Sequence, residues 1–143
     1  MELKLAVKKL REGARLPQYA TAGAAGLDLY ACLDTSMQLA PGEGVLVPSG
    51  IGVAIPSGYV GLVRDRSSLA VQGLLTVAGV IDSDYRGEVL IALRNAAATP
   101  AIIQPGQRIA QMLIIPSPRL SVEELPELPP TARGAGGFGS TGS

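Results

Sequence analysis

Apolar and polar residues alternate along this chain in short runs, and glycine or proline interrupts nearly every run. Such alternation is typical of half-buried β-strands, because neighbouring side chains on a strand point to opposite faces. The Pro-Gly and Pro-Ser-Gly sequences between several runs are turn signals. The pattern therefore predicts an all-β sandwich or barrel. The expected strands cover residues 4–9, 44–48, 51–55, 59–64, 74–81, 88–94 and 108–115.

One segment predicts a helix instead of a strand. Residues 67–73 begin with Ser67 and Ser68, which favour helix N-termini, and end on Gly73, which favours a helix C-terminus. The spacing leaves room for about one to two helical turns. We therefore expect one short helix within the β-domain.

The composition changes after Ser121. The prolines of residues 126–130 block helix and central-strand structure, and the last residues are rich in glycine and serine. We therefore divide the chain into a β-domain over residues 1–125 and a Pro/Gly-rich C-terminal arm over residues 126–143. A disordered tail is the simplest interpretation of the arm. Phe138, the only phenylalanine, favours an arm that closes over a ligand, because no core can use that side chain there.

Charge and composition narrow the possible chemistry. Hydrophobic residues make up 47% of the 143 residues, and the formal net charge is zero. We therefore expect one domain that binds neither a nucleic-acid polymer nor a membrane. The single cysteine, Cys32, excludes an intrachain disulfide and favours a cytoplasmic location. Histidine is absent, so catalysis must use carboxylates, Arg, Ser/Thr or Tyr side chains and a hard cation.

Residues 79–88 are the most informative stretch. An apolar run delivers Asp82, Asp84 and Tyr85 to a turn, and residues 89–93 carry the chain back, which predicts a rigid β-hairpin. A carboxylate held on such a hairpin can serve as a general base, and the Tyr ring offers a flat surface to a sugar or a nucleobase. The alternative is a surface hairpin whose aspartates merely favour the turn.

Three weaker signals accompany this turn. Arg66, Ser67 and Ser68 combine a guanidinium with two hydroxyls at the start of the expected helix, which suits a phosphate group; the alternative is a helix cap with Arg66 paired to Asp65. Asp28 stands between apolar residues, either as a strand-end turn residue or as a charge near a bound cation. Gln111 lies on an alternating strand, as an outward-facing polar residue or as a ligand contact.

Taken together and in order, these segments resemble the five motifs of the trimeric, all-β deoxyuridine triphosphatases (dUTPases). The matching segments are 25–29, 66–70, 79–87, 106–112 and 133–142. The resemblance implies a jelly-roll or β-clip barrel with one short helix and a flexible C-terminal arm. It also implies a homotrimer with shared active sites and Mg²⁺-dependent hydrolysis of dUTP to dUMP and pyrophosphate by water attack at the α-phosphorus. Such an enzyme limits uracil incorporation into DNA and supplies dUMP for dTMP synthesis.

The resemblance also implies roles for individual residues. Asp82 matches the general base, and Asp28 matches the acidic residue that contacts the metal through water. Tyr85 would pack under the deoxyribose and exclude a 2′-hydroxyl, and Phe138 would stack on the uracil. The positions that match substrate contacts are Arg66, Ser67, Ser68, Gly79, Val80, Ile81, Tyr85, Leu90, Gln111, Arg133, Phe138, Gly139, Ser140 and Thr141.

One residue departs from the family pattern, and two other functions compete. Asp65 stands where Pro or Gly is common, and we expect it to pair with Arg64 or Arg86. A dCTP deaminase would need a glutamate three residues before Asn95, where this chain has Ala92. A catalytically inactive regulatory trimer would be expected to lack the base, the Arg-Ser pair or the arm, all of which are present.

Overall fold

The computed structural model describes residues 2–139. Within them the chain forms eleven β-strands and one short helix, which confirms the all-β prediction with a single helical segment. The elements in chain order are β1 (Ala6–Lys9), β2 (Gln18–Tyr19), β3 (Leu27–Tyr30), β4 (Met37–Leu39), β5 (Gly44–Ala54), β6 (Tyr59–Asp65), α1 (Ser67–Ala70), β7 (Leu74–Thr76), β8 (Val80–Ile81), β9 (Glu88–Asn95), β10 (Ala101–Ile103) and β11 (Arg108–Pro116).

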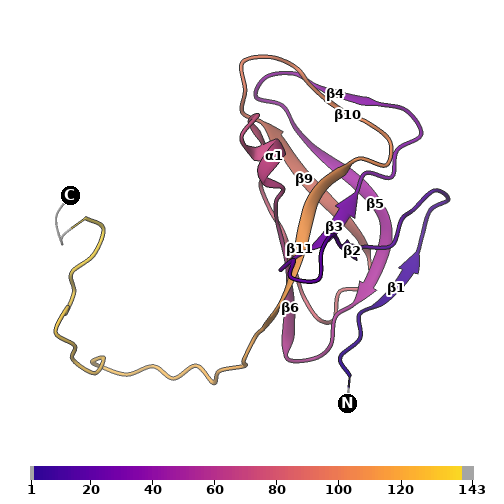
Figure 1. The fold of residues 1–143 in the computed structure, drawn as a ribbon. Coiled ribbons are helices and arrows are strands. Elements are labelled where there is room, and N and C mark those ends of the chain that lie inside the picture. The colour runs from indigo at the N-terminus through magenta and orange to yellow at the C-terminus, as the bar shows by residue number, and fades with distance from the viewer. Residues whose placement is uncertain (1, 140–143) are drawn as a thin grey trace.

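The strands form two main antiparallel sheets and one small one. The four-stranded sheet has the order β1-β5-β9-β7, and the five-stranded sheet has the order β2-β3-β11-β6-β8. A two-stranded sheet, β10-β4, lies at one end of the body (Figure 1). Residues 117–139 carry no helix or strand and leave the body at the end opposite α1 (Figure 1).

The core consists of aliphatic side chains from the inner faces of the two main sheets. Alternation along β9 buries Val89, Ile91 and Leu93 and leaves Leu90 and Arg94 exposed. The other sheet contributes side chains in the same way from β3, β6 and β11. Burying one such side chain stabilises the fold by roughly 1.5–3 kcal/mol. The core therefore holds the two main sheets together, and the positions that alternate with the buried ones face outward.

The predicted strand over residues 74–81 is wrong in an informative way. β7 pairs with β9 in the four-stranded sheet, whereas β8 pairs with β6 in the five-stranded sheet. The chain leaves β9 after Val77 N–H donates to Ala92 O (3.1 Å), and it joins β6 where Val63 N–H donates to Gly79 O (2.7 Å). Residues 77–79 are therefore a strand switch between the sheets, and β8 and β9 do not form the expected hairpin.

Two further expectations need smaller corrections. The predicted strands 44–48 and 51–55 are one strand, β5, whose register against β9 shifts between Pro48 and Gly52. The helix is the four-residue α1, and its N-cap is Arg66, which makes no side-chain capping bond, rather than a serine. Gly73 follows α1 with φ +93°, in keeping with a glycine that ends a helix. The only helix in the described part of the chain is too short to cross a membrane.

Candidate active site

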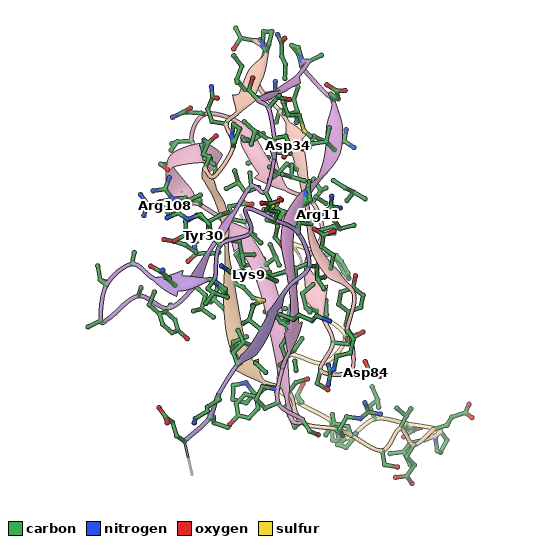
Figure 2. The ribbon with its side chains drawn as sticks, turned by 90° about the vertical axis from the view of Figure 1, so that its right-hand side faces the viewer. Lys9, Arg11, Tyr30, Asp34, Asp84 and Arg108 are labelled. Carbon is green, nitrogen blue, oxygen red and sulfur yellow. The ribbon has the colours of Figure 1, made fainter. Side chains whose placement is uncertain are left out.

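Asp82 lies at the start of a tight turn that its neighbours brace. Tyr85 N–H donates to Asp82 O (3.1 Å), and the Arg86 guanidinium donates to Ser83 O (2.7 Å) and Tyr85 O (3.1 Å). The Asp82 side chain is exposed and lines a cavity of about 470 Å³ together with Asp84 and residues of the β6 start. Figure 2 shows Asp84 near the lower end of the body. A carboxylate on a braced turn is well placed to hold a water molecule.

Tyr85 is held in one orientation by the residues that follow it. Its hydroxyl donates to Glu88 O (2.7 Å), and its ring lies over Gly87, where an added Cβ would stand 2.7 Å from the ring Cζ. Tyr85 as a whole is 40% exposed. A side chain at position 87 would therefore displace the ring, and the ring remains available to a flat ligand.

An ion pair from a distant part of the chain anchors this segment. The Arg11 guanidinium donates twice to the Glu88 carboxylate, at 2.8 and 2.9 Å, and Gly50 N–H donates to the same group at 2.8 Å. The bond from Arg11, helped by the one from Gly50, lowers the pKa of Glu88 against the opposing effect of burial. Figure 2 shows Arg11 beside the strands of the body. This pair could not be predicted from the sequence, because no local pattern connects residues that are 77 positions apart.

The strand switch places the expected uracil contacts beside a gap in the pairing. This gap lies between β8 and β9, which belong to different sheets; Gly79 and Val80 lie on its β8 side and Leu90 on its β9 side. Val80 is 68% exposed and Leu90 is 40% exposed. Ile81, by contrast, is buried in the core, so its side chain is not available to a ligand. A cavity of about 300 Å³ lies along residues 76–80 and the facing part of β6.

Arg66, Ser67 and Ser68 lie where β6 ends and α1 begins. The Arg66 guanidinium donates to Ser68 Oγ (3.0 Å), and both serines are exposed. Because α1 has only four residues, its backbone adds little to an anion site, and the side chains must supply the affinity.

The expected pairing of Asp65 with Arg64 or Arg86 is wrong. The Asp65 carboxylate accepts hydrogen bonds from Thr76 N–H (2.7 Å) and from the Thr76 hydroxyl. Within residues 2–139 it takes part in no ion pair. Strand geometry explains the difference, since successive residues on β6 point to opposite faces and Arg86 is engaged in its own turn.

Gln111 and Asp28 lie in one polar row across the five-stranded sheet. Asp28, Gln111 and Arg64 are successive partners on β3, β11 and β6. Gln111 Nε2 donates to the backbone oxygen that precedes Arg66 (2.9 Å), and Arg108 forms an ion pair with Asp28 at 3.3 Å. Gly26 makes room for the Gln111 side chain, because an added Cβ would stand only 3.0 Å from Gln111 Cβ.

The structure gathers the expected site residues into two groups at a distance from each other. Asp82 follows Ile81, which lies opposite Gly61 on β6, while Arg66 follows Asp65, the last residue of β6. At about 3.3 Å per residue, Asp82 and Arg66 are about 20 Å apart along this strand. A single chain therefore does not bring the turn and the Arg-Ser group together on one small ligand.

The described part of the arm lies apart from both groups. Figure 1 shows it extending away from the body. Arg133 donates to a carbonyl within the arm (2.7 Å), and Phe138 is fully exposed. Gly139 is the last residue described; Ser140 and Thr141 lie outside the described residues.

Metal-ligating side chains do not cluster in the described part of the chain. No group of three or more His, Cys, Asp or Glu residues is placed to hold an ion. The Asp28 carboxylate, 14% exposed and oriented by Arg108, is the acidic group of the polar row. A cation there would need most of its ligands from water or from a substrate.

The chain is similar to known proteins over nearly its whole length. The dUTPase family model matches residues 12–142. A deoxyuridine 5′-triphosphate nucleotidohydrolase of Hydrogenobaculum sp. (strain Y04AAS1) is 50% identical over 143 residues, which cover 98% of this chain and 99% of that protein. One of Rhizobium meliloti (strain 1021) is 50% identical over 137 residues, which cover 92% of this chain and 86% of the relative.

Solved structures of dUTPases resemble this fold. A mutant of the Staphylococcus bacteriophage 80alpha dUTPase with dUpNHpp has a TM-score of 0.91 at 27% identity, covering 98% of this chain and 99% of that one. A mutant dUTPase of S. aureus phage phi11, whose structure describes the coordination of a structural Mg(II) ion, has a TM-score of 0.82 at 25% identity. It covers 88% of this chain and 99% of the phage chain.

Proposed function

This chain belongs to the dUTPase family and is a dUTP diphosphatase, and we propose that Asp82 is its general base. In this mechanism Asp82 orients a water molecule and takes its proton as the water oxygen attacks the α-phosphorus. The bond from that phosphorus to the bridging oxygen breaks, and dUMP and pyrophosphate leave. The braced turn carries the proposal: three hydrogen bonds to backbone oxygens hold the main chain of the turn, and a carboxylate carried on such a turn can position a water molecule for attack.

We propose that the nucleoside is recognised at the strand switch and at Tyr85. The backbone of Gly79, Val80 and Ile81 and that of Leu90 would pair with the uracil edge. The Tyr85 ring, held by Glu88 and Gly87, would pack under the deoxyribose and leave no room for a 2′-hydroxyl.

The phosphates are assigned to the other group of residues. Arg66, Ser67, Ser68 and Gln111 would contact the phosphate chain, since a guanidinium, two hydroxyls and an amide are suitable donors. Gln111 is already oriented by its bond to the backbone of β6.

We propose that Mg²⁺ accompanies the triphosphate. Mg²⁺ keeps several waters and is usually held by one or two carboxylates plus substrate phosphates, so a single carboxylate suits it. Asp28, held in place by Arg108, would contact the ion through water. When bound, the ion would neutralise part of the charge on the triphosphate.

We propose a homotrimer in which each active site takes residues from more than one subunit. The separation of about 20 Å between Asp82 and Arg66 supports this, because it exceeds the reach of one triphosphate chain. The arm would close over a neighbour's site, with Phe138 and Gly139 at the uracil and Arg133, Ser140 and Thr141 at the γ-phosphate. Stacking of Phe138 would contribute roughly 1–3 kcal/mol.

The competing functions have less support. Ala92 supplies no carboxylate for deamination. Its backbone oxygen accepts the hydrogen bond from Val77 N–H, the last bond between the segment after β7 and β9. An inactive regulatory trimer would have no use for a braced Asp82. We retain the cytoplasm as the proposed location.

Product analysis tests the proposed function. The enzyme should release dUMP and pyrophosphate from dUTP, with Mg²⁺ stimulation, and should act poorly on dCTP, dTTP and UTP. In ¹⁸O-water the label should enter dUMP; label found only in pyrophosphate would exclude attack at the α-phosphorus. Asp82→Asn should abolish turnover while dUTP still binds, and Asp84→Asn, in the same turn, is the matched control that should keep activity.

Subunit mixing tests the shared sites. Asp82→Asn and Arg66→Ala trimers should each be nearly inactive, and trimers reassembled from both should regain part of the activity. If the mixed sample stays as inactive as its parents, each subunit has its own complete site.

A further inference from the structure

Asp65 is the unexpected charge of this site, one residue before Arg66 and the proposed phosphate contacts. An isolated carboxylate there would repel a triphosphate. In the structure its Oδ1 accepts two hydrogen bonds from Thr76, one from the backbone N–H at 2.7 Å and one from the hydroxyl. The charge is therefore turned toward β7 and partly satisfied there.

Thr76 occupies a critical place in the topology. It is the last residue of β7, in the four-stranded sheet, and Asp65 is the last residue of β6, in the five-stranded sheet. Immediately after Thr76 the chain makes its last bond to β9, through Val77, and then crosses to β6 at Gly79. The two bonds from Thr76 to Asp65 thus tie the two sheets together where the strand switch begins.

The same residue also contacts the polar row. The backbone oxygen of Asp65 accepts the hydrogen bond from Gln111 Nε2 (2.9 Å). Its main chain therefore holds a proposed phosphate contact, while its side chain holds the start of the segment proposed to bind uracil. These are different atoms, so a substitution can separate the two roles.

We propose that Asp65 is a positioning residue for the nucleoside half of dUTP, acting through Thr76 on the strand switch. The proposal rests on the proposed function in one respect, the assignment of uracil to the backbone of residues 79–81. The acceptor oxygen, rather than the negative charge, carries the effect. Removing the carboxylate frees two donors on Thr76 and lets residues 77–80 shift relative to β6, while the backbone bond to Gln111 survives.

Binding measurements with dUMP and with pyrophosphate test this proposal. For Asp65→Ala we expect the Kd of dUMP to rise about tenfold, the size of one lost hydrogen bond, with less than about twofold change in inhibition by pyrophosphate. Asp65→Asn keeps an acceptor oxygen and should stay within about twofold of the native protein. Asp34→Ala removes an exposed carboxylate elsewhere (Figure 2) and should change neither constant.

Variants of the partner complete the test. Thr76→Val removes the hydroxyl and should weaken dUMP binding by about threefold. Thr76→Ser keeps a hydroxyl and should bind dUMP like the native protein. In the double variant, Thr76→Val should cause no further loss of dUMP binding beyond that of Asp65→Ala. In steady-state kinetics KM for dUTP should rise more than kcat falls. The proposal is overturned if Asp65→Ala binds dUMP normally, or if it weakens inhibition by pyrophosphate as much as it weakens dUMP binding. It is also overturned if Asp65→Asn behaves like the alanine variant. Failure of the native protein to bind dUMP at all would instead refute the proposed function.

Discussion

Replacing Gly79 with alanine should damage both stability and substrate binding. Gly79 lies in the strand switch with φ +150°, a backbone conformation that residues with a Cβ rarely adopt. An added Cβ would stand 2.7 Å from both the Cβ and the backbone oxygen of Val63. Val63 is a buried residue of β6 whose N–H donates to Gly79 O, so neither strand can move without breaking that bond.

The two effects set the expected magnitude. A residue forced into a sparsely populated backbone region costs about 1–3 kcal/mol. Overlap with a packed core adds about 1–3 kcal/mol. Partial relaxation leaves an expected loss of about 3 kcal/mol in the free energy of unfolding, a large part of the 5–15 kcal/mol typical of a domain. The shift of residues 79–80 should also raise KM for dUTP, because their backbone is proposed to pair with uracil.

Urea unfolding at one fixed protein concentration measures the loss, since the stability of an oligomer depends on concentration. With a typical slope, about 3 kcal/mol lowers the midpoint by about 1–2 M. Gly23→Ala is the matched control, because nothing lies within 4 Å of its added Cβ and its φ is not positive, and it should leave the midpoint nearly unchanged. An unchanged midpoint and KM for Gly79→Ala would refute the steric reasoning.

The remaining predictions concern the arm, the sugar and the acid stability. Deleting the residues after Pro130 should leave a folded trimer with greatly reduced activity in a dUTP assay; full activity would mean that the arm has no role in catalysis. UTP should be a very poor substrate beside dUTP, and Tyr85→Ala should narrow the ratio of their kcat/KM values; equal rates for the native enzyme would remove the sugar role of this ring. The lowered pKa of Glu88 means that its ionised form stabilises the fold fully above the usual glutamate value and loses this effect as the pH falls through the lowered pKa. Glu88→Gln should therefore be less stable than the native protein at neutral pH, with the difference shrinking as the pH falls below the usual glutamate pKa in urea titrations; a difference independent of pH would contradict this.

Much of the fold and part of the candidate site could be predicted from local sequence. The alternation in residues 88–94 predicts which side chains β9 buries, because the two faces of a strand are set by a period of two residues. The turn from Asp82 to Tyr85 and the glycine after α1 can also be predicted locally, because turn chemistry depends on adjacent residues. The five motifs indicate the family by their order along the chain, without any contact between them.

The contacts between distant segments depend on the tertiary structure. Residues 74–81 look like one strand, but the close approach of Gly79 to Val63 divides them between two sheets, and local alternation carries no information about which neighbour a strand will join. Asp65 has two arginines nearby in sequence, yet its partner is Thr76 on another sheet. The spacing of the two site groups along β6 is likewise a property of strand register. The order of residues along the chain specifies which side chains are available for the chemistry, whereas long-range strand pairing, which depends on the whole core, sets where those side chains lie.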